Sequence, residues 1–160
     1  MNIRNTIRLG AELNHDSCIF VAGGTGLLGS ALLKRLSNQG FRNIIAPPHR
    51  TLDLTNREAV DSFFCSEKPE YVFIAAGKVG GIIANKTRRA DFMHINLSIQ
   101  DNIFEAANAN QAEHVIFLGS SCTYPRLCEQ PMREDQWMTG AIEETSEAYA
   151  AAKIAGMIAC

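Results

Sequence analysis

The sequence predicts an α/β fold, in which helices cover both faces of a parallel sheet. Three observations lead to this prediction. Short apolar runs alternate along the chain with longer segments of helical periodicity. The runs are continuously apolar, as in strands that are buried on both faces, and a glycine cluster follows the first of them. Strands that alternate with helices form parallel sheets through right-handed crossovers.

The first predicted strand covers residues 18–22, and a helix follows from about 27 to 38. Four apolar residues recur in this helix at three- and four-residue intervals: Leu28, Ala31, Leu32 and Leu36. Gly40 is well placed to end the helix. A second strand at 44–46 is cut short by two prolines, which cannot donate hydrogen bonds to a sheet.

The second half of the chain repeats this alternation. A helix is predicted at 57–67, with Thr55 or Asn56 as its cap. The remaining predicted elements are a strand at 71–76, a long helix at 92–109 with Phe92, Ile95, Ile99 and Ile103 on one face, a strand at 114–119 and a final helix from about Thr145 toward Cys160. The polar segment 122–142 is too long for an ordinary connection, which predicts a functional loop.

Composition bounds the class of protein. The 160 residues carry 15 Lys and Arg against 17 Asp and Glu, and 46% are hydrophobic, which indicates one globular domain and excludes a disordered tail, a coiled coil or a basic nucleic-acid arm. We expect a polar lead-in at 1–17 and a nucleotide-binding domain at 18–160. No apolar run could span a membrane, and no signal peptide is recognisable, so we expect a cytoplasmic protein.

The five cysteines are an odd number without a CxxC pair or a Cys/His cluster. This spacing argues against a disulfide framework and against a structural zinc. We therefore expect reduced thiols and no metal.

The glycine cluster has the spacing G-x-x-G-x-x-G, formed by Gly23, Gly26 and Gly29 between a strand and a helix. In such a loop the first glycine allows a tight turn, the second lets the backbone approach a pyrophosphate, and the third lets the helix pack on the sheet. The loop residues predicted to contact a dinucleotide are Gly23, Thr25, Gly26, Leu27, Leu28 and Gly29. The alternative is a glycine-rich turn that only packs.

The end of the second strand bears on the choice between NAD and NADP, because an acidic residue there holds the ribose 2′-hydroxyl and a cation accepts a 2′-phosphate. The sequence has no carboxylate at this position, and Arg50, together with His49, could pair with a phosphate. We therefore favour NADP, with a solvated loop charge as the alternative for Arg50. Asp53 and Leu54 are predicted to contact adenine, although Asp53 is equally suited to a turn.

Tyr149 and Lys153 lie one helical turn apart, on one face of the final helix. A nearby cation favours the phenolate, so Tyr149 could exchange a proton with a carbonyl or carbinol oxygen. Ser120, at the end of the preceding strand, could bind the same oxygen. Without the glycine loop, the tyrosine and lysine would be read as an ordinary amphipathic pair.

Three further segments carry a resemblance to a known family. They read Lys78-Val-Gly-Gly-Ile82, Gly119-Ser-Ser-Cys-Thr-Tyr-Pro125 and Gln130-Pro-Met132. Together with the glycine loop and the tyrosine and lysine, residues 18–160 resemble the N-terminal part of the GDP-L-fucose synthases, which belong to the extended short-chain dehydrogenases/reductases. The resemblance implies a Rossmann-like domain that is incomplete on its C-terminal side.

The resemblance implies NADPH-dependent epimerisation at C3 and C5 of GDP-4-keto-6-deoxy-D-mannose, followed by reduction at C4. Ser120 would hold the substrate oxygen, Tyr149 would donate the proton at C4, and Lys153 would bind the nicotinamide ribose and lower the pKa of Tyr149. Cys122 would be the acid/base of epimerisation, with a small buried apolar side chain as the alternative. Ala75, Ala76 and Gly77 would line the cofactor, and Asn96 would lie beside the site.

The resemblance also implies a GDP-sugar as the ligand, with no nucleic-acid or membrane partner, and a homodimer formed through the helices at 92–109 and 145–160. Two departures from the family pattern stand out. The turn at 143–148 lacks the usual prolines, which is expected to loosen the approach to Tyr149, and the family's second epimerisation residue, a histidine, has no match here. The alternatives are an inactive nucleotide-binding module, or another nucleotide-sugar epimerase, dehydratase or reductase.

Overall fold

The structure is a computed structural model that describes residues 13–160. Its centre is a parallel sheet with the strand order β2-β1-β3-β4. The strands are β1 (Ile19–Ala22), β2 (Ile44–Ile45), β3 (Tyr71–Ile74) and β4 (His114–Phe117). The predicted lead-in at 1–17 falls mostly outside the described residues.

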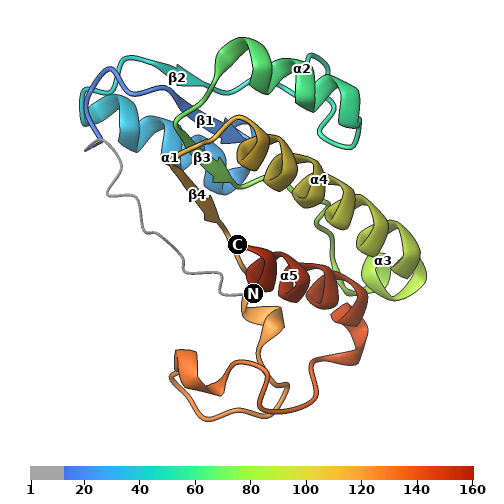
Figure 1. Ribbon diagram of the computed structural model, residues 1–160. Coiled ribbons are helices and arrows are strands. Elements are labelled where there is room, and N and C mark those ends of the chain that lie inside the picture. Colours follow the sequence, from blue (N-terminus) through green and yellow to red (C-terminus); the bar gives the residue numbers. More distant parts are fainter. Residues whose placement is uncertain (1–12) are drawn as a thin grey trace, which may run out of the picture.

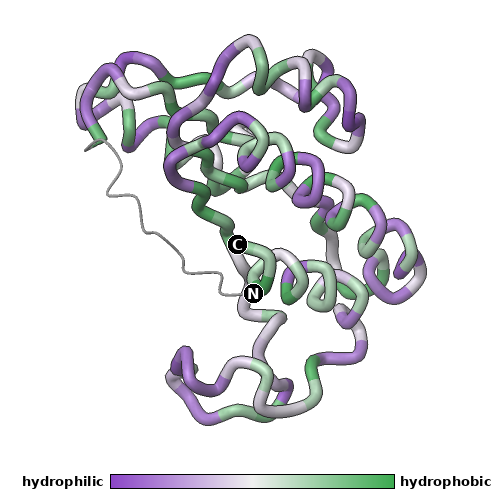
Figure 2. The backbone as a smooth tube through the Cα atoms, viewed as in Figure 1, coloured by the Kyte–Doolittle hydropathy of each residue, from purple (hydrophilic) through white to green (hydrophobic). Residues whose placement is uncertain are grey.

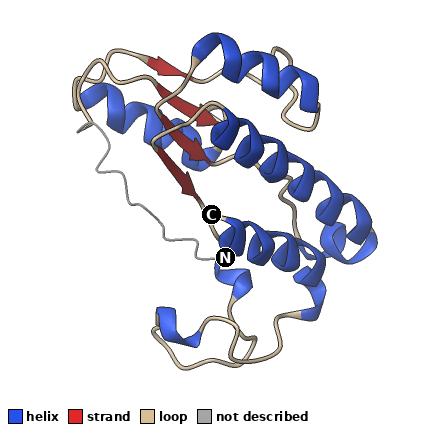
Figure 3. Cartoon of the chain, in the orientation of Figure 1, coloured by secondary structure: helices blue, strands red, loops and turns tan. Residues whose placement is uncertain are grey.

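Five α-helices flank this sheet: α1 (Leu27–Asn38), α2 (Arg57–Glu67), α3 (Ile82–Thr87), α4 (Arg89–Ala109) and α5 (Glu147–Ala159). In Figure 1, α2, α4 and α5 lie in a row on one side of the sheet, and α1 lies on the other side. Figure 3 shows that a long loop with only short helical turns joins β4 to α5. The predicted Rossmann-like arrangement, with helices on both faces, is confirmed.

The two faces of the sheet have separate apolar clusters. Phe20, Val72 and Ile74 point to one face and pack against residues of α2 and α4, such as Phe64 and Ile103. Figure 2 shows the apolar residues concentrated along the strands and on the inner sides of the helices. Alternate strand residues point to opposite faces of a sheet. A sheet that is covered by helices on both sides therefore requires continuously apolar strands, and the sequence shows such strands.

On the second face, Ile19, Val21 and Tyr71 pack with Leu36 of α1, and Leu32 and Leu33 lie against this cluster. The predicted apolar face of the helix is therefore partly wrong. Leu28 is 60% exposed, and Ala31 is also exposed. The inward stripe begins at Leu32 because the first turn of α1 belongs to the glycine loop, beyond the end of β1.

Close packing fixes α5 beside α4 and β4. The side-chain amide of Gln100 donates to the carbonyl of Ala152 at 2.9 Å. A Cβ atom on Gly156 would come within 2.5 Å of the Phe117 ring and 2.7 Å of the Gln100 side chain. The helix that carries Tyr149 is therefore held at a fixed distance from the sheet.

Some predicted boundaries differ from the structure. Pairing in β3 ends at Ile74 and in β4 at Phe117, because the chain turns into loops that line cavities. The long helix begins at Arg89, and the separate helix α3 precedes it, where no helix was predicted. Among the described residues no helix is both long and apolar enough to cross a membrane. All five cysteines are free.

Candidate cofactor and active site

The glycine loop joins β1 to α1, and two of its glycines make close backbone contacts. Gly23 has a φ of +84°, a left-handed conformation that favours glycine, and a Cβ on it would lie 2.6 Å from the amide nitrogen of Ala76. A Cβ on Gly29 would lie 2.1 Å from the carbonyl oxygen of Gly23. The loop, the helix and the end of β3 are therefore packed backbone to backbone.

Gly26 differs from these two glycines. Its amide donates to the Gly23 carbonyl at 2.9 Å, but the Gly23 oxygen, at 3.3 Å, is the nearest atom that a Cβ on Gly26 would meet. Gly26 is also the N-cap of α1 and makes no side-chain capping bond. The first amides of the helix are thus presented beside open space, an arrangement suited to a pyrophosphate.

A cavity of about 360 Å³, here called the glycine-loop cavity, opens beside this loop. Its walls come from the segments that follow β1, β2 and β3, with two residues of α4. The lining residues are Gly23, Thr25, Gly26, Pro47, His49, Leu52, Asp53, Leu54, Thr55, Ala75, Ala76, Gly77, Lys78, Ile95 and Ile99. Eight of the residues predicted to bind a cofactor are in this set: Gly23, Thr25, Gly26, Asp53, Leu54, Ala75, Ala76 and Gly77.

Five predicted cofactor residues lie outside this lining: Leu27, Leu28, Gly29, Arg50 and Lys153. Gly29 is buried in backbone contacts, and Leu27 and Leu28 are exposed on the first turn of α1. Arg50 is exposed in the loop after β2. The structure thus brings eight of the predicted residues together around one cavity, and Arg50 is not among them.

Asp53 forms part of a turn and also lines the glycine-loop cavity. One carboxylate oxygen accepts from the Thr55 amide at 2.9 Å and from the Thr55 hydroxyl at 2.7 Å, as in a turn. These hydrogen bonds hold the pKa of Asp53 below its ordinary value. The carboxylate is therefore charged near neutral pH while it lines the cavity. The cap of α2 is Asn56, whose side chain accepts from the amide of Ala59.

Ser120 and Tyr149 meet at the carboxyl end of β4. Their side chains share a hydrogen bond, which lowers the pKa of Tyr149, but burial of the phenol is the larger effect and raises this pKa overall. Cys122 adds a smaller effect in the same direction as burial. The amide of Cys122 donates to the Ser120 hydroxyl oxygen at 3.2 Å.

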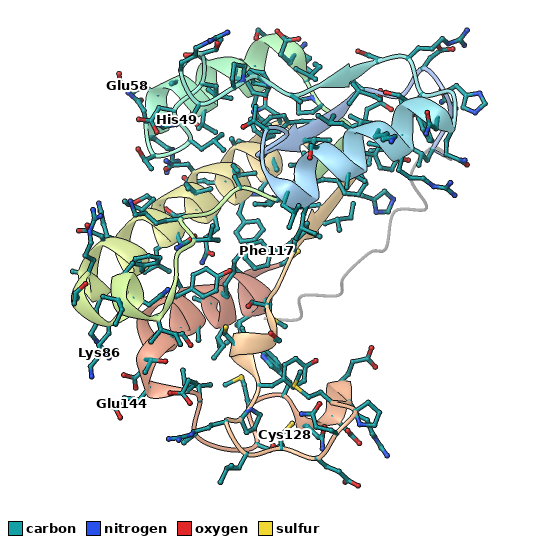
Figure 4. All side chains as sticks on the ribbon, turned by 180° about the vertical axis from the view of Figure 1, so that it is seen from behind. His49, Glu58, Lys86, Phe117, Cys128 and Glu144 are labelled. Carbon is teal, nitrogen blue, oxygen red and sulfur yellow. The ribbon has the colours of Figure 1, made fainter. Side chains whose placement is uncertain are left out.

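Lys153 extends from α5 toward the end of β4. Its ammonium donates to the carbonyl of Leu118 at 2.9 Å and lies 4.4 Å from the centroid of Phe117, whose position in the middle of the molecule Figure 4 shows. Burial lowers the pKa of Lys153 to about 8. The amine is thus directed to the end of β4.

A second cavity, of about 660 Å³, is here called the Tyr149 cavity. Its lining combines the segment after β3, the start of α3, the β4 loop and the start of α5: Val79, Gly80, Gly81, Ile82, Asn85, Cys122, Glu143, Thr145, Ser146 and Tyr149. Cys122 and Tyr149 therefore face one space. Residues 77–82 border both cavities, since Gly77 and Lys78 line the glycine-loop cavity.

Asn96 on α4 fixes the segment between the cavities. Its side-chain oxygen accepts from the Lys78 amide at 3.0 Å, and its amide group donates to the Lys78 carbonyl at 3.0 Å. Asn85, which the sequence reasoning missed, holds the next part of the segment by donating to the carbonyls of Gly80 and Gly81. Its buried side-chain oxygen has no partner among the described residues, and this orphaned acceptor points to a ligand donor.

Charged residues contact the turn before α5 from two directions. Glu143 pairs with Arg126 at 3.1 Å and accepts from the amide of Thr145. Arg89 of α4 pairs with Glu147 and donates to the carbonyl of Glu144. These contacts link the turn to α4 and to the β4–α5 loop, and the predicted looser approach to Tyr149 stays a prediction.

The glycine loop after the first strand, and cavities at the carboxyl edge of a parallel sheet, are the features of a Rossmann-like dinucleotide-binding domain. The comparison with family models agrees with this class. Residues 19–160 match the model of the NAD dependent epimerase/dehydratase family, and the chain belongs to that family.

Named relatives narrow the comparison. The chain is 50% identical over 142 residues to GDP-L-fucose synthase 1 of Arabidopsis thaliana, covering 89% of this chain and 44% of the relative. It is 44% identical to GDP-L-fucose synthase of Escherichia coli (strain K12), with the same coverage. A solved GDP-mannoheptose C4 reductase from Campylobacter jejuni with NADP bound has a TM-score of 0.88 and 39% identity, over 92% of this chain and 47% of that one. The chain thus spans less than half the length of these relatives.

Proposed function

We propose that this chain is the cofactor-binding part of a GDP-L-fucose synthase, which epimerises C3 and C5 of GDP-4-keto-6-deoxy-D-mannose and reduces C4 with NADPH. The observation that carries the proposal is the meeting of Cys122 and Tyr149 in one cavity, beside a second cavity built on the glycine loop. The names of the relatives supply the substrate class.

The residues present fit a dinucleotide. The open space at Gly26 and the uncapped start of α1 suit a pyrophosphate, and Leu54 and Ile99 offer apolar walls to a base or a nicotinamide ring. Bound NADPH would supply the hydride. NADP in solved neighbours, including a GDP-L-fucose synthetase from Naegleria fowleri at 27% identity, supports this choice of cofactor.

The chain's own residues would manage the protons. Ser120 would hold the 4-keto oxygen, and Tyr149 would protonate it, because its raised pKa keeps the phenol protonated near neutral pH. Lys153 would turn from the Leu118 carbonyl to the cofactor ribose. Cys122 would remove or return protons next to the keto group, which acidifies the neighbouring C–H bonds.

Three further features belong to the proposal. A cytoplasmic location agrees with the class of GDP-sugar enzymes that the relatives represent. Isomerase activity follows from the epimerisation steps. The resemblance to the family implies a homodimer through α4 and α5, and a groove between these helices includes Leu97, Phe104 and Ala155.

The test is turnover of GDP-4-keto-6-deoxy-D-mannose with NADPH by the protein that carries this chain. Tyr149→Phe is expected to lower the reduction rate at least about 100-fold while NADPH binding persists. Tyr124→Phe is the matched control, because Tyr124 does not line the Tyr149 cavity. Unchanged turnover in the Tyr149 variant would refute the assignment of the proton donor.

A second candidate is a related nucleotide-sugar reductase, favoured by the 39% identity to a GDP-mannoheptose C4 reductase. Product analysis with other 4-keto sugar nucleotides separates the two functions. If no sugar nucleotide is converted but NADPH binds, the result would favour the alternative that the chain is an inactive nucleotide-binding module.

A further inference from the structure

The sugar of the proposed substrate has free hydroxyls at C2 and C3, and the inference about their recognition rests on the proposed function. A hydroxyl that enters a cavity needs a hydrogen-bond partner, because an unpaired buried polar group costs free energy. The lining of the Tyr149 cavity therefore bears on which hydroxyl is recognised. Among the described residues of this lining, Glu143 is the one whose side chain ends in a carboxylate.

Glu143 lies in the turn directly before α5, the helix that carries Tyr149. One carboxylate oxygen accepts from the amide and from the hydroxyl of Thr145, each at 3.3 Å. The other oxygen lies 3.1 Å from Nε of Arg126. A carboxylate has about four acceptor sites, and this side chain is 39% exposed. The group is therefore held in place and still has acceptor capacity that a ligand can reach.

Asn85 of α3 adds a second acceptor to the same lining. In Figure 1 the turn before α5 lies beside α3. The side-chain nitrogen of Asn85 donates to the carbonyls of Gly80 at 2.8 Å and Gly81 at 3.2 Å, which fixes the orientation of the amide. Its buried Oδ1 has no partner among the described residues. A wall with a spare carboxylate acceptor and an unpaired amide oxygen is complementary to a ligand that donates hydrogen bonds, as sugar hydroxyls do.

The position of the reacting carbon distinguishes the two hydroxyls. Ser120 and Tyr149, whose side chains share a hydrogen bond, would hold the oxygen at C4. The C3 hydroxyl is on the adjacent ring carbon, and the C2 hydroxyl is one carbon further away. Because Glu143 and Tyr149 line one cavity, the C3 hydroxyl is the one that chemistry at Tyr149 brings into it. On the other side of C4 the ring carries the C6 methyl group, for which Val79 and Ile82, 73% and 67% exposed, offer an apolar surface in the same lining.

We propose that Glu143 binds the 3-hydroxyl of the 4-keto sugar during reduction and determines the preference for sugars that have this hydroxyl. The carboxylate accepts a hydrogen bond from the hydroxyl, and no covalent bond changes at Glu143. A 3-deoxy sugar offers no donor at this point, so the carboxylate keeps an unused acceptor in the closed complex. Sites that hydrogen-bond a substrate hydroxyl discriminate strongly against analogues that lack it.

The test is the rate of NADPH oxidation with GDP-4-keto-6-deoxy-D-mannose and with its 3-deoxy analogue, in the full protein that carries this chain. The wild type is expected to have the higher kcat/KM for the 3-hydroxy sugar. Glu143→Gln keeps the shape of the side chain and removes its charge, so the ratio of the two kcat/KM values should fall about tenfold. The value for the 3-deoxy sugar should change little. Both sugars are measured on one preparation, so the folded fraction of a variant cancels in this ratio.

Arg126→Gln is the matched control. It breaks the same ion pair, but Arg126 is not part of the cavity lining, so this variant should keep the wild-type ratio. Glu143→Asp retains a carboxylate and should recover part of the preference that Glu143→Gln loses. These two variants separate recognition of the hydroxyl from a purely structural role of the ion pair.

Each outcome decides a different point. If Glu143→Gln keeps the wild-type ratio, or Arg126→Gln loses it to the same extent, the role of Glu143 is refuted, while turnover by the wild type leaves the proposed function standing. A wild type that reduces both sugars equally well also refutes the inference. If the folded wild type converts neither sugar with NADPH, the proposed function fails, and the inference fails with it.

Discussion

Substituting alanine at two glycines of the same loop should separate its structural role from its ligand-binding role. In Gly29→Ala the new Cβ would lie 2.1 Å from the Gly23 carbonyl oxygen and 2.9 Å from the Cα of Gly24. Both are backbone atoms, so the loop itself must move. In Gly26→Ala the nearest atom is 3.3 Å away, and a shift of a few tenths of an ångström removes the contact.

The magnitudes differ accordingly. Overpacking costs about 1–3 kcal/mol or more, and the clash at Gly29 involves only backbone, which places it at or above the upper end. Replacing glycine by alanine within a helix stabilises the helix by about 1 kcal/mol, which offsets part of this cost. Gly29→Ala should therefore lose about 2 kcal/mol or more of unfolding free energy, a fall in melting temperature of about 4–8 °C for a domain of this size.

Gly26→Ala should keep nearly all of its stability and lose NADPH affinity, because its Cβ would occupy the space beside the helix start. Denaturant titration and thermal unfolding measure the unfolding free energy of each variant, and calorimetry measures its affinity for NADPH. Wild-type stability of Gly29→Ala would refute the close-contact argument. Wild-type NADPH affinity of a folded Gly26→Ala would refute the cavity as the cofactor site.

Two further substitutions test local parts of the structure. Asn56→Ala removes the cap of α2, whose side chain accepts from the Ala59 amide at 3.0 Å, and should lower the unfolding free energy by about 1 kcal/mol in urea titrations; an unchanged midpoint would contradict the cap. Burial lowers the pKa of Lys153 from 10.5 to about 8, so between these values the unfolded chain binds the proton more tightly than the folded one. The stability of the wild type should therefore rise with pH relative to Lys153→Met, by up to about 3 kcal/mol, and a pH-independent difference in denaturant titrations would contradict a buried ammonium.

The sequence predicted the fold best where a residue type is required by the backbone conformation, or where apolar residues form a regular pattern. The glycine spacing predicted the turn at Gly23 and the contact at Gly29, because only glycine permits that φ and that approach. The apolar runs located all four strands. The face of α1 was harder to predict: Leu28 fits the helical period but lies in the exposed first turn, since periodicity does not show where a helix meets its sheet.

Side-chain electrostatics were less predictable than the fold. The spacing of Tyr149 and Lys153 indicated proximity, but the direction of the ammonium depends on the Leu118 carbonyl and the Phe117 ring, which come from a distant strand. Asn85 carried no recognisable signal beyond its place after the Lys78–Ile82 motif.

The most direct test of the central claim, that this chain carries a dinucleotide site on its glycine loop, is a backbone amide NMR titration with NADPH. The account predicts the largest shifts in three segments that line one cavity: 23–26, 52–55 and 75–78. Residues of the groove between α4 and α5, such as Ser98 and Ala159, serve as an internal control, and their amide signals should not shift. Shifts confined to that groove, or no shifts in a folded chain, would contradict the account.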